Sequence, residues 1–370
     1  MKITGAVLNR IADAPPFQSS QPIEVTELDL ADPQPGELLV KISAAGVCHS
    51  DLSVVNGTRV RPVPMLLGHE CSGVVVASRA EHIAAGDHVV LTFVPRCGRC
   101  PACLADRPAL CSAGARANGA GEMLTGGSRL SRNGEPIRHH LGVSAFADYA
   151  VVDQGSVVVV PKDVPLDVAV LFGCAVLTGA GAIFNTAAVR KGQNVAVWGL
   201  GGVGMSAVMA SAAAQADVII AIDPDAHKRA IALEVGATHA ISPQESLRDV
   251  LPHGVDVALE AVGSAAVLAE AVAATAPGGM TVTVGLPAPN DQLTISPLAL
   301  VAESRTLAGS YLGAANPERD IPAMIDLWRS GRLPVERLRS GSIPLSQINQ
   351  AMDDLAAGRV IRQIITFDEG

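Results

Sequence analysis

A cluster of four glycines restricts the fold of this chain more than any other feature. It stands between a β-branched run that predicts a buried strand, 194–198, and a predicted apolar helix, 205–214, and it consists of Gly199, Gly201, Gly202 and Gly204. A second apolar strand, 218–222, follows the helix and leads directly into Asp223. This order of strand, glycine turn, helix and strand is typical of a parallel βαβ unit, so we expect an α/β fold with a doubly wound parallel sheet.

The same stretch fits the binding of a dinucleotide. The glycines allow a tight turn and let backbone N–H groups approach a pyrophosphate at the helix N-terminus. Asp223 can accept hydrogen bonds from the adenosine ribose, its carboxylate would repel a 2′-phosphate, and no arginine stands at 224–226, so NAD is favoured over NADP. Lys228 either hydrogen-bonds the same ribose or is a solvated residue at a helix start.

Three residues far apart in the sequence are candidate ligands of a catalytic zinc ion. They are Cys48, His69 and Cys174. Apart from Cys71, which directly follows the stretch 48–70, Cys174 is the one cysteine outside both this stretch and the cluster that begins at Cys97. Two thiolates, one imidazole and a vacant fourth position make zinc a Lewis acid. Asp51 can accept the second ring N–H of His69, and Glu70 lies beside that ligand. Taken alone, Cys48 and His69 could equally be buried core residues.

A second group of cysteines is much more closely spaced: Cys97, Cys100, Cys103 and Cys111. Four thiolates at such spacings can fill every position of one tetrahedral ion, which predicts a structural zinc. Two disulfides or an iron–sulfur centre remain alternatives. The absence of a secretory apolar segment after Met1 makes disulfides less favoured.

Length and composition limit the possible classes of protein. A chain of 370 residues favours two domains, and 49% apolar with 17% charged residues is typical of a packed globule. The net charge of −9, with no dense Lys/Arg run, argues against a nucleic-acid or anionic-membrane partner. We expect no run of roughly 18 apolar residues to cross a bilayer, and therefore a cytoplasmic protein.

The rest of the sequence predicts further strands and helices. Short β-branched runs cut by Gly and Pro, such as 37–42, 73–76 and 87–91, predict an irregular β domain up to about residue 160. The Gly-, Ser- and Arg-rich stretch 114–145 predicts a long surface loop. A helical pattern covers 166–184 and includes Cys174. We also expect two helices, 317–330 and 346–357, and a last strand, 360–367, that returns to the first domain.

With these motifs, the chain resembles the zinc-containing alcohol dehydrogenases of the medium-chain dehydrogenase/reductase superfamily over nearly its whole length. The similarity is greatest with the long-loop branch, which includes liver-type alcohol dehydrogenase and the thiol-dependent formaldehyde dehydrogenases. Besides the glycine and cysteine clusters, three short stretches carry it: Gly46-Val-Cys-His-Ser-Asp51, Gly126 to Arg129, and His139 to Gly142.

The resemblance implies a GroES-like, irregular β-rich catalytic domain formed by 1–176 and 311–370, with a structural zinc lobe at about 95–113. The Rossmann domain would comprise 177–310. The family also implies NAD, two zinc ions per subunit, a small alcohol or aldehyde substrate, and a homodimer that joins the nucleotide-domain sheets across a two-fold axis.

Several residue roles follow from the resemblance alone. Cys48, His69 and Cys174 match the catalytic-zinc ligands, and the four clustered cysteines match the structural-zinc ligands. Ser50 matches the hydroxyl that accepts the alcohol proton, and Phe93 matches a wall of the substrate pocket. Four further residues match cofactor contacts: Thr178 and Val203 at the nicotinamide, and His49 and Arg362 at the pyrophosphate.

The chain departs from the family pattern in three places. Ser53 stands where many relatives have a relay histidine, so the proton would leave through Ser53, water or another route. Arg59 and Arg61 occupy a stretch that is acidic in formaldehyde dehydrogenases, and with Arg116 they could bind an anionic substrate group or be solvated charges. His140 stands where relatives have an aromatic lining residue, and it either adds polarity to the substrate pocket or faces solvent at its rim.

The expected function is therefore the reversible oxidation of primary or secondary alcohols to aldehydes or ketones by zinc- and NAD-dependent hydride transfer. One alternative is a formaldehyde dehydrogenase that uses a thiol other than glutathione. Another is a sensor or scaffold that binds NAD and zinc without turnover. The open metal position and Ser50 favour an enzyme, because a scaffold needs neither.

Overall fold

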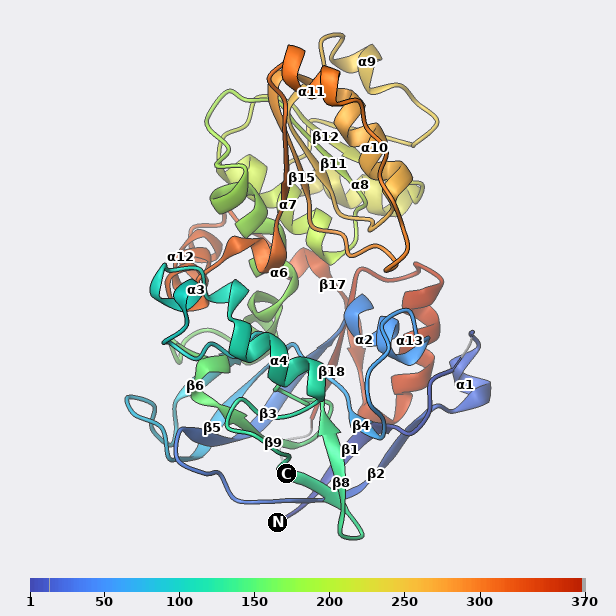
Figure 1. The fold of residues 1–370 in the computed structure, drawn as a ribbon. Helices are drawn as coiled ribbons and strands as arrows, with labels where there is room; N and C mark the ends of the chain where they lie inside the picture. The colour runs from blue at the N-terminus through green and yellow to red at the C-terminus, as the bar shows by residue number, and fades with distance from the viewer. Residues whose placement is uncertain (13, 368–370) are drawn as a thin grey trace. The chain divides into compact units, whose positions relative to one another are not determined.

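The computed structural model describes residues 1–12 and 14–367 (Figure 1). The chain forms two compact units. The first contains residues 1–174, 316–321 and the chain from Arg339 onward, and the second contains 175–315 and 322–338.

Two sheets build the first unit. One closes into a barrel in the order β1 (Lys2–Leu8), β2 (Ile23–Leu30), β7 (Leu130–Arg132), β8 (Glu135–His139) and β4 (Met65–Leu66). The other runs in the order β10 (Val157–Val160), β6 (His88–Leu91), β5 (Cys71–Ser78), β3 (Glu37–Val47), β18 (Arg362–Thr366) and β17 (Arg339–Ile343), with β9 (Tyr149–Asp153) also paired to β3. The irregular β domain and its three quoted strands are thus confirmed.

The long strand β3 organises this unit, because it pairs with β5, β9 and β18. Its inward-facing apolar side chains, among them Leu38, Val40 and Ile42, are almost completely buried, as alternation along a half-covered strand requires. Since β18 pairs with β3, the last strand does return to the first unit, as predicted.

A six-stranded parallel sheet forms the core of the second unit. Its order is β13 (His239–Ile241), β12 (Ile219–Ile222), β11 (Val195–Trp198), β14 (Val255–Glu260), β15 (Thr275–Thr283) and β16 (Thr306–Gly309). The inner strands β11 and β12 are buried along their whole length, which explains their unbroken apolar sequence. The chain reverses its direction across the sheet between β11 and β14, and ligands of such folds bind at the carboxyl ends of the strands at this point.

The helices vary greatly in length. Those of the first unit are α1 (Phe17–Ser20), α2 (His49–Val55), α3 (Pro101–Leu104), α4 (Ser112–Ala120), α5 (Leu166–Ala169) and α13 (Ile348–Ala356). Those of the second are α6 (Ala175–Gly181), α7 (Gly202–Ala213), α8 (Ala226–Glu234), α9 (Leu247–Val250), α10 (Ala265–Ala274) and α11 (Pro297–Ala302). α12 (Pro317–Arg329) belongs to the first unit up to Ile321 and to the second from Pro322.

Two sequence predictions were wrong. The stretch 114–145 is not an open loop, because α4, β7 and β8 lie in it, and Met123, Leu130 and Ile137 are buried in the barrel core. The predicted helix 166–184 is broken at Cys174, whose backbone (φ −142°, ψ −72°) is not helical.

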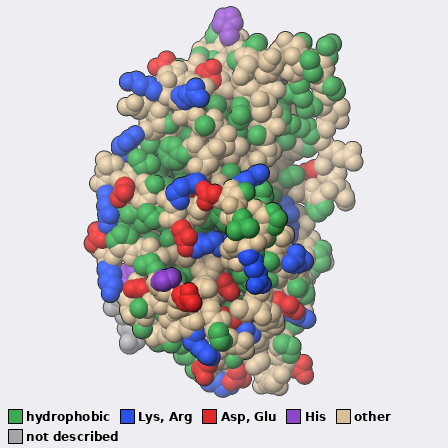
Figure 2. All heavy atoms as spheres, turned by 60° about the vertical axis from the view of Figure 1, so that its left-hand side comes forward, with side chains coloured by type: hydrophobic (Ala, Val, Ile, Leu, Met, Phe, Trp, Pro, Cys, Tyr) green, Lys and Arg blue, Asp and Glu red, His purple; other side chains and the backbone are tan. Residues whose placement is uncertain are grey.

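No single helix among the described residues is long and apolar enough to cross a membrane; one bent pair, 166–173 with 175–186, would pass on length and composition alone. On the face drawn in Figure 2, Lys and Arg side chains are interspersed with Asp and Glu side chains.

Candidate metal centre and nucleotide-binding turn

The structure brings four predicted site residues together inside the first unit: Cys48, His69, Glu70 and Cys174. One potential ligand atom from each lies within 4.8 Å of the others, and all four residues are buried. Cys48 lies between β3 and α2, His69 and Glu70 lie directly before β5, and Cys174 stands at the helix break. The break is therefore what turns the Cys174 sulfur toward the other ligands.

Two glycines make room for this cluster. Gly68 has φ +93°, and a Cβ there would lie 2.4 Å from the backbone nitrogen of Phe146. A Cβ on Gly46 would lie 2.7 Å from the Glu70 carboxyl carbon. The backbone clash and the positive φ require glycine at position 68, and a larger residue at position 46 would displace the Glu70 side chain from the cluster.

Asp51 links two of the candidate ligands. Its Oδ1 lies 3.0 Å from Nδ1 of His69, and its Oδ2 accepts the backbone N–H of Cys48 at 3.1 Å. Burial alone would lower the pKa of His69, but the charge and the hydrogen bond of Asp51, together with the nearby Cys48, raise that pKa well above its usual value. The expected hydrogen bond is present, and it makes His69 a more basic ligand with Nε2 free to bind a metal.

The donor atoms of this cluster fit a zinc ion. Within the described part of the chain, the buried Nε2 of His69 has no hydrogen-bond partner. A hydrogen bond from the Cys174 thiol holds the pKa of Cys48 well below its usual value, and the same bond raises the pKa of Cys174. Two sulfurs that compete for one proton beside an unpaired imidazole nitrogen are the arrangement that a zinc ion would satisfy.

Glu70 is held by Arg362. The two side chains are buried, and Nη1 of Arg362 lies 3.3 Å from Oε2 of Glu70 and donates to the carbonyl oxygen of Val47 at 2.9 Å. Burial raises the pKa of Glu70 to about 7, although Arg362 opposes this shift. No motif in the sequence signals this pair, because its members are far apart along the chain.

His140 does not face solvent. It is 1% exposed, so the rim position considered for it is wrong, and its Nδ1 lies 3.1 Å from Oδ1 of Asp51. The rings of His140 and Phe93 both stand edge-on to the His69 ring, with centroids at 5.5 Å and 5.6 Å. Phe93 is therefore next to the metal cluster, as a wall of a pocket there would be.

The other residues expected near the metal lie on α2 or just beyond its end, outside the cluster of candidate ligands. His49 and Ser50 are the first two residues of α2, directly after Cys48, with His49 exposed and Ser50 half-buried. Ser53 donates its hydroxyl proton to the His49 carbonyl oxygen at 2.7 Å. Arg59 lies beyond the end of α2 and is half-buried, outside the cluster of candidate ligands.

The four clustered cysteines converge in the first unit, with their sulfurs all within 4.8 Å of one another. The Cys111 sulfur accepts the backbone N–H groups of Cys97 and Gly114, each at 3.3 Å. The Cys103 backbone N–H lowers the pKa of Cys100 to about 6, whereas burial raises the pKa of Cys103 to about 12. All seven cysteines of the chain are described and free, so the structure shows no disulfides in place of a metal.

The glycine turn has the expected form in the second unit. α7 begins at Gly202, and a Cβ on Gly204 would lie 1.7 Å from the Gly199 carbonyl oxygen. Asp223 is buried and also shapes the turn, because its Oδ2 accepts the backbone N–H of Leu200 at 2.7 Å. The sequence does not reveal this second task of Asp223.

Three other predicted cofactor contacts lie in the same unit as this turn. A Cβ on Gly179 would lie 2.1 Å from the Val203 carbonyl oxygen, so α6, which carries the buried Thr178, packs closely on α7. Lys228 is half-buried in α8, and its backbone N–H is bound by the Asp225 carboxylate at 3.2 Å. Thr178, Val203 and Lys228 thus share the unit that carries the glycine turn.

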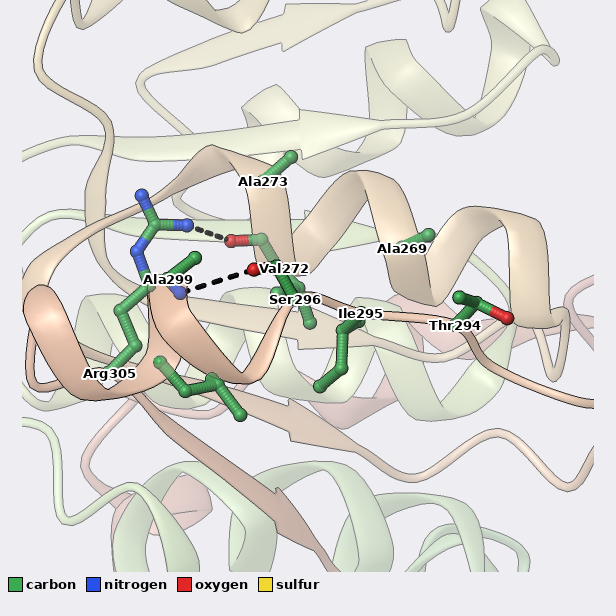
Figure 3. Close-up of a pocket in the computed structure, with 9 residues that line it drawn as sticks. Ala269, Val272, Ala273, Thr294, Ile295, Ser296, Ala299 and Arg305 are labelled. Atoms are coloured by element: carbon green, nitrogen blue, oxygen red, sulfur yellow. Dashed lines mark hydrogen bonds between the residues drawn. The ribbon is translucent and has the colours of Figure 1, made fainter.

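A separate cavity of about 380 Å³ lies in the second unit between α10 and α11 (Figure 3). Small apolar side chains such as Val272 and Ile295 line it, together with Arg305. The Arg305 guanidinium donates to the Val272 carbonyl oxygen at 2.6 Å and pairs with Glu303, so its charge is already compensated. This cavity contains none of the predicted site residues.

Comparisons with known proteins agree with this geometry. Residues 34–162 match the family model of the alcohol dehydrogenase GroES-like domain, and residues 202–330 match that of the zinc-binding dehydrogenase. The chain is 38% identical, over 99% of its length, to the whole of a Mycobacterium tuberculosis protein provisionally named alcohol dehydrogenase D.

Two solved structures are similar over the whole of both chains. One is an alcohol dehydrogenase zinc-binding domain protein from Burkholderia ambifaria (36% identity, TM-score 0.93). The other is benzyl alcohol dehydrogenase from Acinetobacter calcoaceticus (31% identity, TM-score 0.92).

These matches define the class: the chain belongs to the zinc-binding alcohol dehydrogenases of the medium-chain dehydrogenase/reductase superfamily. Within this class it is an enzyme, a zinc-dependent oxidoreductase of the alcohol dehydrogenase type. The two-domain fold expected from the sequence, GroES-like and Rossmann-like, is confirmed.

Proposed function

We propose that the enzyme oxidises primary or secondary alcohols reversibly to aldehydes or ketones, with NAD as the hydride acceptor. The observation that carries this proposal is the buried cluster of Cys48, His69 and Cys174, in which His69 Nε2 lacks a hydrogen-bond partner within the described chain. Three such ligands leave a zinc ion one position for a substrate oxygen. A bound zinc supplies Lewis-acid polarisation of that oxygen and lowers the pKa of the alcohol.

Glu70 could in principle occupy the fourth position, because its carboxylate lies in the same cluster. We assign Glu70 a place outside the metal's coordination because its Oε2 lies 3.3 Å from the Arg362 guanidinium, whose positive charge competes with a metal for the carboxylate; neither carboxylate oxygen makes a hydrogen bond of full geometry in the described chain. In this proposal Glu70 and Asp51 orient the site, and the fourth position stays open. The four cysteines at 97–111 hold a second, structural zinc, since they offer four ligands by themselves.

The other residues take the roles that the resemblance implied. Ser50 accepts the alcohol proton, Phe93 forms a wall of the substrate pocket, and Arg59 lies toward the pocket mouth. His49 and Arg362 meet the cofactor pyrophosphate. The edge-on contact of Phe93 with His69 supports its place beside the metal.

The choice of NAD rests on the second unit. The glycine turn stands at the carboxyl end of β11, beside the reversal of strand order where dinucleotides bind. Asp223 follows β12, and its carboxylate disfavours a 2′-phosphate. Thr178, Val203 and Lys228 complete the proposed cofactor contacts, and Val203 and Thr178 lie on closely packed helices.

Assembly as a homodimer is part of the proposal. β16 is an edge strand of the parallel sheet, and an edge strand can pair with its counterpart in a second copy. Close in sequence to β16, Leu298 and Val301 of α11 are 76% and 79% exposed, which favours a protein contact there. We also propose the catalytic domain as 1–176 with 311–370, the dinucleotide-binding domain as 177–310, and membership of the long-loop branch.

The experiment is a substrate panel followed by the absorbance of the reduced cofactor. Purified zinc-loaded enzyme is assayed with NAD and with NADP against aliphatic, secondary and benzylic alcohols, and against formaldehyde with and without low-molecular-weight thiols. Alcohol turnover with NAD and no thiol supports the proposal. Turnover only of formaldehyde and only with a thiol would establish the formaldehyde alternative, and no turnover of any substrate would favour the sensor.

A further inference from the structure

We propose that His140 is a positioning residue of the metal centre: it holds the Asp51 carboxylate and, through it, the His69 ring. This inference rests on the proposed function, because it takes His69 to be a zinc ligand. It gives His140 a task different from lining the substrate pocket.

The first observation is a carboxylate oxygen shared by two imidazoles. Oδ1 of Asp51 lies 3.0 Å from Nδ1 of His69 and 3.1 Å from Nδ1 of His140. All three side chains are at most 1% exposed, so water cannot replace any of these contacts. Nδ1 of His140 makes no hydrogen bond of full geometry in the described chain, so its contact with the Asp51 carboxylate is a close charge contact, in which a buried ring nitrogen carries the proton.

The second observation is that the backbone around His140 is fixed. The His140 backbone N–H donates to the Ser144 hydroxyl oxygen at 2.8 Å, and that hydroxyl donates to the Leu66 carbonyl oxygen at 2.9 Å. Leu66 belongs to β4, which leads through Gly68 to His69. The turn that carries His140 is therefore tied to the segment that carries the ligand, so the imidazole can act as a rigid support.

The third observation concerns the rings. His140 and Phe93 both stand edge-on to His69, with interplanar angles of 81° and 84°. A phenylalanine at position 140 would keep such a ring contact and lose only the N–H that faces Asp51. His140→Phe thus separates the hydrogen-bonding role from packing, whereas His140→Asn keeps an N–H donor near the position of Nδ1.

The test measures the release of zinc to a chromophoric chelator from the full-length, zinc-loaded protein. The wild type should release two zinc ions per chain in two phases, one for each cluster. Loss of an outer-shell partner costs about 10- to 100-fold in metal affinity. Because His140 acts through Asp51, we expect His140→Phe to speed one phase by about 3- to 10-fold and to leave the four-cysteine phase unchanged.

His140→Asn should restore a rate within about twofold of the wild type. His139→Phe is the matched control, since His139 is equally buried but its Nε2 accepts the Arg129 backbone N–H at 3.2 Å, away from Asp51. It should lower thermal stability without changing either phase. His140→Leu, which also lacks a donor, serves if His140→Phe does not fold.

Equal rates in the wild type and His140→Phe, or equal acceleration by His139→Phe, would overturn this inference alone. A wild-type protein that binds one zinc per chain would overturn the proposed function together with it.

Discussion

Replacing Asp51 with asparagine tests how the metal centre is held. Both carboxylate oxygens of Asp51 face donors: Oδ2 accepts the Cys48 backbone N–H, and Oδ1 faces the ring nitrogens of His69 and His140. An asparagine has one acceptor and one NH₂ group, so one side must set a donor against a donor. If the NH₂ group faces His69, the ring proton moves to Nε2, the atom that should bind zinc.

The expected loss of zinc affinity follows from this mismatch of donors. Loss of an outer-shell carboxylate typically costs about 10- to 100-fold in metal affinity, or roughly 1.4 to 2.7 kcal/mol. Asp51→Asn should therefore weaken binding of the catalytic zinc by this amount and lower kcat/KM in parallel. The structural zinc should remain, because its cysteines are remote in sequence and make no contact with Asp51 in the described structure.

The assay is competition for zinc with a chelator of known affinity, combined with steady-state kinetics. Asp153→Asn is a suitable control, since Asp153 is also buried in the first unit but its carboxylate accepts the Gly155 backbone N–H, at 2.7 Å, and is no member of the metal cluster. The Asp153→Asn variant should retain both zinc ions. Wild-type zinc affinity and activity in Asp51→Asn would refute the reasoning.

Three further predictions follow. Cys174→Ser should abolish activity with little loss of thermal stability, whereas Cys103→Ser should remove the second zinc and lower the melting temperature; equal destabilisation would contradict the division into two sites. Arg129→Ala leaves Glu37 buried and unpaired, and should cost about 3–5 kcal/mol in denaturant unfolding. Burial raises the pKa of Glu37, but Arg129 lowers it more, so that the pKa lies below 4.5 in the folded protein. The stabilisation by this pair is therefore complete above about pH 4.5 and is lost as the pH falls below it. A difference in unfolding free energy between wild type and Arg129→Ala that does not change with pH would count against the pair. Gly204→Ala would place a methyl group 1.7 Å from a carbonyl oxygen of the glycine turn and should weaken NADH binding at least about tenfold in a fluorescence titration; unchanged binding would argue against this turn as the cofactor site.

The parts of the fold that the sequence predicts well depend on short-range patterns. The glycine turn with its flanking strands follows from local periodicity, and the cysteine cluster follows from spacing along the chain. Cys48, His69 and Cys174 could be proposed as partners because cysteine is rare in this chain, which left few combinations.

The parts that the sequence does not predict depend on distant contacts. The Glu70–Arg362 pair joins the residue before β5 to the first residue of β18, and these two strands lie on either side of β3 in the folded sheet. The stretch 114–145 was misread because its few apolar residues, such as Met123 and Ile137, are separated by polar residues and glycine without helix or strand period. Burial of His140 beside Asp51 likewise depends on tertiary packing, which residue type alone does not reveal.

The most direct test of the proposed chemistry is a crystal structure of the zinc-loaded enzyme, with anomalous diffraction at the zinc edge, determined with and without NAD. We predict a zinc ion bound by Cys48, His69 and Cys174, with its fourth position taken by an oxygen that does not belong to the protein. A zinc ion that keeps the Glu70 carboxylate as its fourth ligand in both crystals, or no zinc between these three side chains, would contradict the account.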